Sequence, residues 1–258
     1  MKLLIFDMDG VIYRGNSPLP GAKETLEALR RQGKFIAFLT NNSTMTRFQY
    51  RRKLAHMGIK ASVKEIFTSA WGTALFLKEK NLKRAFVIGE EGLKKELRWA
   101  GIEVVSLPDI DVDCVVVGLD RKFTYKKLCY AFKAVRKGAQ FIATNKDWTF
   151  PLENEIVPGG GAIVSALQFA LNQEPILIGK PSLFLLELVI KHFKVSKGET
   201  VIVGDRLDTD IEMGLRAGIK TVLVLTGVTT EEELSNSTFK PDAIVKNIGE
   251  LLQIEWLK

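Results

Sequence analysis

The chain has 258 residues, of which 46% are hydrophobic and 26% are charged, so it can bury a substantial core and form one large domain or two smaller ones. It contains no uncharged apolar run of about 18 residues and no basic-then-apolar N-terminal segment, which argues against a membrane protein and a secreted one. We therefore expect a cytoplasmic protein, and two domains rather than one.

The distribution of charge and the small number of Cys and His residues argue against nucleic-acid binding, a zinc cluster and a hydrolase triad. The net charge of +7 fits an anionic partner, but Lys and Arg are spread among acids. No basic cluster with interleaved aromatic residues occurs, so we expect no nucleic-acid binding. The Cys and His residues (Cys114, Cys129, His56, His192) are too few and too scattered for a zinc cluster or a hydrolase triad. A bound metal would therefore be held by oxygen.

The chain opens with a short apolar strand that ends in acids. Leu3 to Phe6 precede Asp7 and Asp9, and Gly10 allows a sharp turn. Open α/β sheets bind their ligands beyond the carboxyl ends of the strands, so this pair is well placed for chemistry. A pair of ordinary solvated loop acids is the alternative that this segment by itself leaves open.

Helices and strands alternate in the next segments. A helix is predicted from about residue 20, because Ala22, Leu26 and Leu29 share one face, and a buried strand follows at 35–39. Two further helices come before a second apolar series. This alternation predicts an α/β fold with a parallel, doubly wound, Rossmann-like sheet.

Short polar residues follow the second strand at once: Thr40, Asn41, Asn42 and Ser43. A Thr hydroxyl and backbone N–H groups that lead into a helix can bind phosphate oxygens without a full positive charge. Capping of the next helix by Asn42 or Ser43 is the alternative.

A second series of strands and helices begins near Arg84 and ends in the turn residues Asn172 to Pro175. Its apolar strand segments are 85–88, 104–105, 114–117 and 141–142. We expect it to form a small α/β unit of its own, and another α/β series to run from Ile176 to the C-terminus.

Two more strand ends carry charge. Lys180 follows an apolar run and is kept out of the next helix by Pro181, so it is a candidate to neutralise an anion. A later strand is followed by Asp205, Asp208 and Asp210, which exceed what one helix cap requires. We expect Asp208 to cap the following helix and Asp205, nearest the strand end, to ligate a metal.

Two common phosphate-binding loops are not supported. No G-x-x-x-x-G-K-[ST] motif is present, and the glycines at 159–161 lack the later glycine of the dinucleotide fingerprint.

Taken together, four ordered motifs resemble those of haloacid dehalogenase superfamily phosphatases. They are Asp7-x-Asp9-Gly10, Thr40, Lys180-Pro181, and Gly204-Asp205 with Asp210. Thr40-Asn41-Asn42, Gly179-Lys180-Pro181 and the run from Gly204 to Ile211 look like the NagD-like, p-nitrophenyl phosphatase branch. In that branch an α/β cap is inserted between the Thr and Lys motifs. The resemblance therefore implies a discontinuous catalytic core over 1–80 and 178–258, with a cap over 81–177.

The resemblance implies a Mg²⁺-dependent phosphatase of small phosphate monoesters. Asp7 would attack phosphorus to form an aspartyl-phosphate, and Asp9 would protonate the leaving oxygen and later deprotonate water. For that role Asp9 must be protonated at neutral pH, and we predict that neighbouring negative charge raises its pKa. The carboxylates of Asp7 and Asp205 and the Asp9 backbone carbonyl would hold Mg²⁺. Asp210 would orient a metal-bound water or Lys180.

Other residues are expected to contact the substrate. Thr40, the Asn41 backbone and Asn42 would bind phosphate oxygens, and Lys180 would offset their charge. Asp147 resembles a cap acid expected to face the active-site crevice.

Several alternatives stay open. One is a phosphomutase of the same superfamily, although the larger inserted cap implied by the resemblance favours hydrolysis. Another is a non-catalytic sensor of a phosphorylated metabolite, which degenerate motifs would have favoured, whereas these motifs are complete. A dehalogenase needs neither a metal nor Asp9, so both features argue against it. Specificity is expected in loops around Asn145, Asp147 and Trp148, although Trp148 suits the cap core equally well. Sugar phosphates, nucleoside monophosphates, phosphoglycolate and pyridoxal phosphate all remain candidate substrates. Exposed cap surface could support a homodimer.

Overall fold

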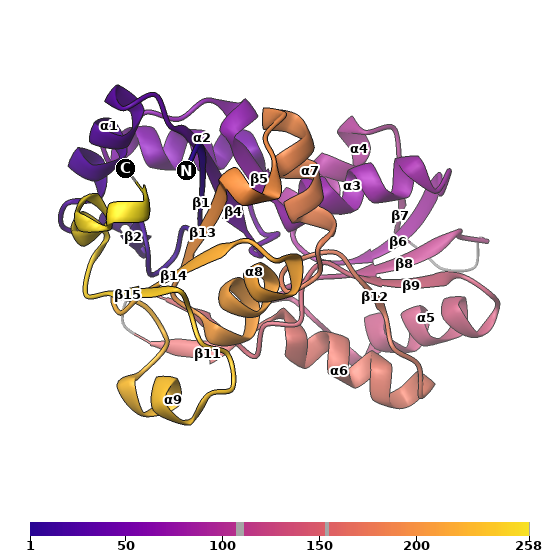
Figure 1. Cartoon of the computed structure of the whole chain (residues 1–258). Coiled ribbons are helices and arrows are strands. Elements are labelled where there is room, and N and C mark those ends of the chain that lie inside the picture. Colours follow the sequence, from indigo (N-terminus) through magenta and orange to yellow (C-terminus); the bar gives the residue numbers. More distant parts are fainter. Residues whose placement is uncertain (107–110, 153–154, 258) are drawn as a thin grey trace. The chain divides into compact units, whose positions relative to one another are not determined.

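The computed structural model describes residues 1–106, 111–152 and 155–257 and divides the chain into two compact units (Figure 1). The first consists of Met1–Thr40, Arg51–Phe67 and Lys180–Lys258, and the second of Asn41–Tyr50 and Thr68–Gly179. Each unit has its own parallel sheet, and the predicted α/β fold is confirmed. The predicted domain boundaries, with a cap over 81–177, stay a prediction.

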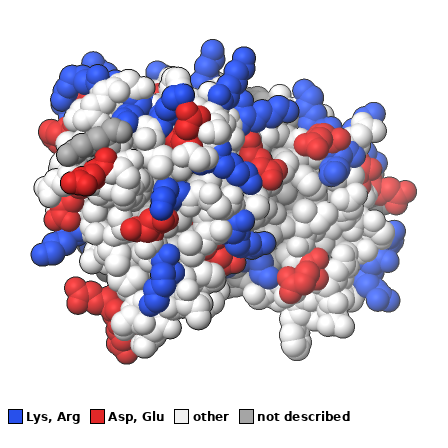
Figure 2. Space-filling view, in the orientation of Figure 1, with Lys and Arg blue, Asp and Glu red and all other residues white. Residues whose placement is uncertain are grey.

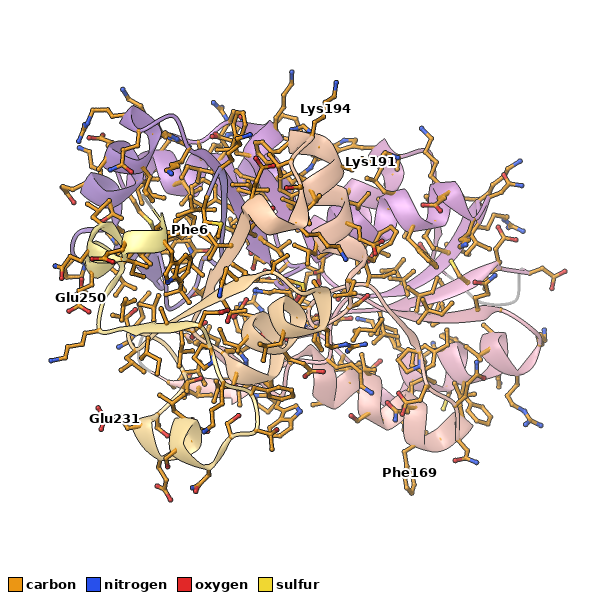
Figure 3. All side chains as sticks on the ribbon, in the orientation of Figure 1. Phe6, Phe169, Lys191, Lys194, Glu231 and Glu250 are labelled. Atoms are coloured by element: carbon orange, nitrogen blue, oxygen red, sulfur yellow. The ribbon has the colours of Figure 1, made fainter. Side chains whose placement is uncertain are left out.

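Six strands form the sheet of the first unit, in the order β15-β14-β13-β1-β4-β5. Their bounds are β1 Leu3–Phe6, β4 Phe35–Thr40, β5 Ile66–Thr68, β13 Thr200–Gly204, β14 Lys220–Val224 and β15 Ala243–Val245. β1 lies between β13 and β4 and is parallel to both. All four residues of β1 are buried, as expected for a parallel strand covered on both faces. The last of them, Phe6, is labelled in Figure 3.

The direction of winding reverses beside β1. From β1 the chain adds β4 and then β5 on one side, and later adds β13, β14 and β15 on the other side. The reversal between β1 and β13 is a topological switch point, where crevices open at the carboxyl ends of the strands. The acids that follow these two strands are thus brought to one edge of the sheet.

Helices and short turns complete the first unit. The helices are α1 Ala22–Arg31, α7 Phe184–Phe193, α8 Glu212–Ala217 and α9 Glu231–Asn236, with a π-helix at Leu207–Ile211. α2, Arg47–His56, begins in the second unit and ends in the first. A hairpin joins β2 Tyr13–Arg14 to β3 Ser17–Pro18, and short 3₁₀ helices lie at Val63–Glu65, Lys197–Glu199, Ile248–Gln253 and Glu255–Leu257. The predicted first helix is confirmed, since Ala22, Leu26 and Leu29 are buried on α1.

The second unit has a five-stranded parallel sheet in the order β12-β9-β8-β6-β7. Its strands are β6 Arg84–Ile88, β7 Glu103–Val105, β8 Cys114–Val117, β9 Gln140–Ala143 and β12 Ile176–Leu177. A separate hairpin joins β10 Thr149–Pro151 to β11 Ile156–Pro158, and the helices are α3 Ser69–Glu79, α4 Glu91–Trp99, α5 Tyr125–Arg136 and α6 Gly160–Leu171. The prediction that a new series begins at Ile176 was wrong, because Ile176 and Leu177 pair with Ile142 and Ala143 of β9.

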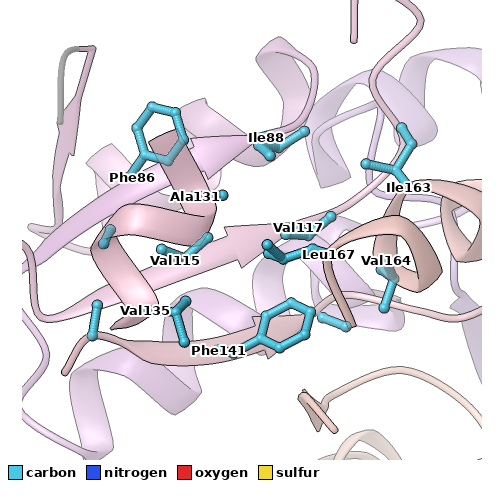
Figure 4. Packing of buried hydrophobic residues seen from close by; sticks show 13 residues of the cluster. Phe86, Ile88, Val115, Val117, Ala131, Val135, Phe141, Ile163, Val164 and Leu167 are labelled. Atoms are coloured by element: carbon cyan, nitrogen blue, oxygen red, sulfur yellow. The ribbon is translucent and has the colours of Figure 1, made fainter. Parts of the chain in front are cut away.

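Aliphatic and aromatic side chains of the sheet pack under two helices to form the core of the second unit (Figure 4). Phe86, Val115 and Phe141 come from β6, β8 and β9, while Val135 and Leu167 come from α5 and α6. All five are at least nine-tenths buried. Cys114 on β8 is buried and Cys129 on α5 is partly buried, and neither forms a disulfide.

Both signs of charge occur on the face shown in Figure 2, where Asp and Glu are scattered among more numerous Lys and Arg side chains. Some apolar side chains are exposed, among them Phe169, which points outward from α6 in Figure 3. Within the described parts of the chain, no helix has both the length and the apolar character needed to cross a membrane.

Candidate active site

Three buried carboxylates meet at the switch point of the first unit. Asp7 directly follows β1, Asp205 directly follows β13, and Asp210 lies in the π-helix after it. A ligand atom of each lies within 4.8 Å of those of the other two. Gly204 makes this approach feasible, since a Cβ at that position would overlap the Asp210 side chain. The structure therefore brings the two predicted metal carboxylates together and adds Asp210 to them.

Lys180 joins this cluster as its cation. Its Nζ donates to Asp7 Oδ1 at 2.5 Å and to Asp210 Oδ1 at 2.7 Å, and the Leu39 carbonyl at the end of β4 accepts a longer bond of 3.4 Å. The Lys180 residue is only 3% exposed. One buried ammonium thus faces three carboxylates, so the cluster has an excess of negative charge when all three are ionised.

Titration of the cluster reflects its burial first and this excess second. Burial raises the pKa of Asp7 well above its usual range; Lys180 opposes the rise and the other two acids add to it. Burial, followed by the charge of Asp210, raises the pKa of Asp205 to about 7. Burial disfavours the charged form of Lys180, yet Asp210 and Asp7 raise its pKa overall. An additional cation would stabilise the ionised carboxylates.

The donor set fits Mg²⁺. The side-chain ligands offered by Asp7, Asp205 and Asp210 are all carboxylate oxygens, and Mg²⁺ prefers oxygen ligands while keeping several waters. Among the described residues, no Cys or His belongs to this group, so the softer ligands that favour zinc are absent from it. The further ligand expected from the Asp9 backbone carbonyl stays a prediction.

Asp9 lies in the turn after Asp7 and differs from it electrostatically. Burial raises the pKa of Asp9 to about 6, and the positive charge of Lys53 and a hydrogen bond from the Gly15 backbone oppose the rise. The prediction that neighbouring negative charge would raise this pKa was wrong in its cause, because burial raises the pKa and the nearby charge, on Lys53, is positive. Lys53 Nζ lies 3.9 Å from the centre of the Tyr13 ring.

The polar residues after β4 are divided between the two units. Thr40 is the buried last residue of β4, next to β1 in the first sheet, whereas Asn41 begins a segment of the second unit. Asn42 Oδ1 accepts from the backbone N and the hydroxyl of Thr44 at 2.9 and 2.7 Å. Thr46, rather than Asn42 or Ser43, caps α2, because its Oγ1 accepts from Gln49 N at 3.3 Å.

Asp147 and Asn41 are hydrogen-bonded in the second unit. Asn41 Nδ2 donates to Asp147 Oδ1 at 2.8 Å, and the Asn41 carbonyl accepts from the Ser69 hydroxyl at 2.5 Å. A small cavity beside Asp147 is lined mainly by polar and glycine residues: Asn42, Ser43, Leu119, Asn145, Asp147, Thr149, Phe150, Gly159 and Gly160. Trp148 is 76% exposed and is therefore no part of the core.

Asp208 has a different role from the one predicted. Its carboxylate accepts from Arg206 Nε at 3.0 Å and Nη2 at 2.9 Å, and it does not cap α8. The backbone enters α8 through the π-helix at Leu207–Ile211 without a side-chain cap, so the expected N-cap position does not exist. This pairing leaves Asp210, rather than Asp208, to contact Lys180.

Sequence reasoning missed the loop after β14. Thr226 Oγ1 donates to the Gly10 carbonyl at 2.6 Å, and Val228 N donates to Asp205 Oδ2 at 2.8 Å. The signal was present in the sequence, because a polar Thr226-Gly227 pair closely follows the apolar strand 220–224, as polar residues follow the other strands of this sheet.

Two family models match the chain. The one described as haloacid dehalogenase-like hydrolase matches residues 4–103, and the one described as HAD-hydrolase-like matches residues 177–251.

Individual relatives match nearly the whole chain. Phosphoglycolate phosphatase 1A, chloroplastic, of Arabidopsis thaliana is 39% identical over 98% of this chain and 76% of that protein. The structure of 4-nitrophenylphosphatase from Thermotoga maritima is 38% identical with a TM-score of 0.92, covering 100% of this chain and 98% of that one. The structure of glycerol phosphate phosphatase from Mycobacterium tuberculosis in complex with magnesium is 31% identical with a TM-score of 0.89, covering 97% and 76%.

Proposed function

The chain belongs to the haloacid dehalogenase-like hydrolases and is a phosphatase, and we propose that it hydrolyses small phosphate monoesters with Mg²⁺ through an aspartyl-phosphate on Asp7. The observation that carries the proposal is the cluster of Asp7, Asp205 and Asp210 around Lys180 at the switch point. Such a cluster can hold a divalent cation and a carboxylate nucleophile side by side.

Asp7 is the proposed nucleophile. One of its carboxylate oxygens attacks phosphorus, the ester P–O bond breaks, and the phosphoryl group stays on Asp7. The bond from Lys180 to Asp7 Oδ1 restrains the carboxylate and favours its ionised form, which burial alone would disfavour. Mg²⁺ held by Asp7, Asp205 and the Asp9 carbonyl, with Asp210 beside them, would offset the repulsion between the anionic phosphate and the nucleophile.

Asp9 is the proposed acid and base. It gives its proton to the leaving oxygen, and in the second step it takes a proton from the water that attacks phosphorus and releases Asp7. A pKa of about 6 leaves part of the Asp9 population protonated near neutral pH. This fraction supports a role as acid, and the ionised form that remains after the first step supports the role as base.

Thr40, at the end of β4, and Lys180, in the segment before α7, are proposed to bind the phosphate oxygens. For the second unit we propose the role of cap, with Asn41, Asn42 and Asp147 contributing to substrate binding. The cytoplasmic location and a homodimer stay predictions.

Hydrolysis is favoured over the alternative functions. The relatives named above are all phosphatases, and their named substrates are small: phosphoglycolate, glycerol phosphate and nitrophenyl phosphate. We propose the same class of small monoester here. Among the site residues that the structure describes, none favours phosphoryl transfer to a second hydroxyl compound or binding without turnover.

The test is phosphate release from p-nitrophenyl phosphate with Mg²⁺ and with EDTA. We expect Mg²⁺-dependent turnover that is lost in Asp7→Asn and strongly reduced in Asp9→Asn. Glu232→Gln, which neutralises an exposed carboxylate on α9, is the matched control and should match the wild type. Equal rates for wild type and Asp7→Asn would overturn the assignment of the nucleophile. A panel with phosphoglycolate and glycerol phosphate would then rank substrates.

A further inference from the structure

The loop after β14 touches two parts of the site at once. Thr226 Oγ1 donates to the Gly10 carbonyl at 2.6 Å, in the turn that carries Asp9. Two residues later, Val228 N donates to Asp205 Oδ2 at 2.8 Å. A third bond, from Thr229 N to the Asp205 carbonyl at 3.2 Å, ties the same loop to the end of β13.

The Gly10 turn, the loop after β14 and Asp205 are closely packed against one another. Gly10 has φ +81°, and a Cβ there would lie 2.5 Å from Asp205 Oδ2 and 2.9 Å from the Gly227 Cα. A Cβ on Gly227 would in turn overlap the Asp205 carboxylate. Since real Cβ atoms essentially never approach other atoms so closely, both positions need glycine for the loop and the turn to meet at Asp205.

The loop is itself anchored on its outer side. Arg14 Nη2, from the hairpin strand β2, donates to the Thr226 carbonyl at 2.7 Å. Thr226 therefore bridges β2 and the Gly10 turn through its carbonyl and its hydroxyl. The backbone position of the loop is held independently of the Thr226 side chain, so removal of the hydroxyl should remove the anchor of the Gly10 turn on this loop without unfolding the loop. The turn keeps its own backbone bonds, such as Gly10 N to the Tyr13 carbonyl at 2.9 Å.

We propose that Thr226, Gly227 and Val228 form a positioning loop, which fixes the turn bearing Asp9 through Thr226 and the orientation of the Asp205 carboxylate through Gly227 and Val228. This proposal rests on the function proposed above, in which Asp205 holds the metal and Asp9 transfers the proton. Hydrogen bonds from outside the ligand set commonly orient metal ligands and tune their affinity. The loop links the metal ligand to the acid, since it contacts both.

The experiment compares Thr226→Val, which keeps the shape and removes the donor, with Thr226→Ser, which keeps the donor, and with Gly227→Ala. Turnover of p-nitrophenyl phosphate gives kcat and KM, and titration of the metal-free protein with Mn²⁺, followed by the EPR signal of the free ion, gives metal affinity without turnover. Mn²⁺ stands in for Mg²⁺ because both suit carboxylate ligands. Thermal unfolding shows whether each variant is folded.

We expect Thr226→Val to lower kcat by about tenfold with little change in KM, and Thr226→Ser to retain wild-type kcat within about twofold. Gly227→Ala should weaken Mn²⁺ binding by about tenfold or more, because its methyl group displaces the Asp205 carboxylate. Wild-type kcat in Thr226→Val, equal losses in the Val and Ser variants, or unchanged Mn²⁺ affinity in a folded Gly227→Ala variant would each overturn the proposal.

The two proposals fail in different ways. If the wild type binds Mn²⁺ but releases no phosphate from any ester, the proposed function fails, while weaker Mn²⁺ binding in Gly227→Ala still supports the effect of the loop on Asp205. If the wild type is active and the variants match it in both measurements, only the positioning loop fails.

Discussion

The Nζ of Lys180 lies 2.5 Å from Oδ1 of Asp7, and both side chains are almost completely withdrawn from solvent. The two residues are 173 positions apart in the sequence, and they meet because the end of β1 and the segment before α7 belong to the same unit. A buried ion pair of this kind is costly to break, since removal of one partner leaves the other charge without compensation.

Replacement of Lys180 by Met should therefore reduce both stability and activity. In EDTA we expect the unfolding free energy, measured in urea, to fall by about 3 kcal/mol, because Asp7 and Asp210 lose their buried cation. Phosphate release should fall by about 100-fold or more. Lys191→Met, at an exposed position on α7 (Figure 3), is the control and should change neither value. A stable, active Lys180→Met variant would contradict the structural role given to the pair.

The pH dependence of turnover should report Asp9. Its pKa is about 6, so the protonated acid disappears as the pH rises through that value, and kcat/KM should fall on the alkaline side. Lys53 lowers this pKa by its positive charge, so Lys53→Met should raise it and move the alkaline limb to higher pH. The measurement is kcat/KM for p-nitrophenyl phosphate from about pH 4.5 to about pH 9, a range that spans the alkaline limb because the limb lies near the pKa.

Lys64→Met provides the comparison for that shift, because it removes the same charge from an exposed residue of the 3₁₀ helix Val63–Glu65, whereas the charge that acts on Asp9 is that of Lys53. Its profile should coincide with that of the wild type. An alkaline limb that stays in place in Lys53→Met would show that Asp9 does not govern it.

Stability without metal should decrease with rising pH. Asp205 has a pKa of about 7 in the folded protein, against about 3.9 for an ordinary Asp, so the folded state binds its proton more tightly than the unfolded chain does. The unfolding free energy in EDTA should fall between about pH 4 and pH 7, by up to about 1.4 kcal/mol per unit for this group. The raised pKa of Lys180 adds no slope in this range, because Lys is protonated throughout it in both states.

Two comparisons check this slope. Asp205→Asn should make it shallower, and the remainder should reflect Asp7 and Asp9, whose pKa values are also raised. Saturating Mg²⁺ should reduce the slope in the wild type, because the ion binds the ionised carboxylates of the folded state. A wild-type protein that gains stability from pH 4 to 7 in EDTA would contradict the raised pKa of Asp205.

Truncation of Phe141 should lower the unfolding free energy far more than truncation of Trp148. Trp148 is 76% exposed, so Trp148→Ala should leave the unfolding free energy within about 0.5 kcal/mol of the wild type. Phe141 is 2% exposed in the core of the second unit, so Phe141→Ala should cost about 3–5 kcal/mol. Urea unfolding of both variants tests the placement of Trp148 outside the core. An effect of Trp148→Ala on KM would support its proposed part in specificity.

Much of the fold and part of the site could be predicted because the relevant signals are local. An apolar run followed by Asp7, and another followed by Asp205, places each acid at a strand end whatever the rest of the chain does. Alternation of strands with helices implies parallel pairing, which gathers the strand ends at one edge. The resemblance to haloacid dehalogenase superfamily phosphatases, and to the p-nitrophenyl phosphatase branch among them, is confirmed by the family models and the relatives.

By itself, then, the sequence determined which chemical groups stand at the ends of which strands, because side-chain type and strand length are properties of neighbouring residues. Only the tertiary structure decided which groups meet and how they titrate. It paired Asp208 with Arg206, raised the pKa of Asp9 by burial beside Lys53, and set Thr226 on the Gly10 turn. Burial and contacts between distant segments depend on the packing of the whole chain, so no local pattern records them.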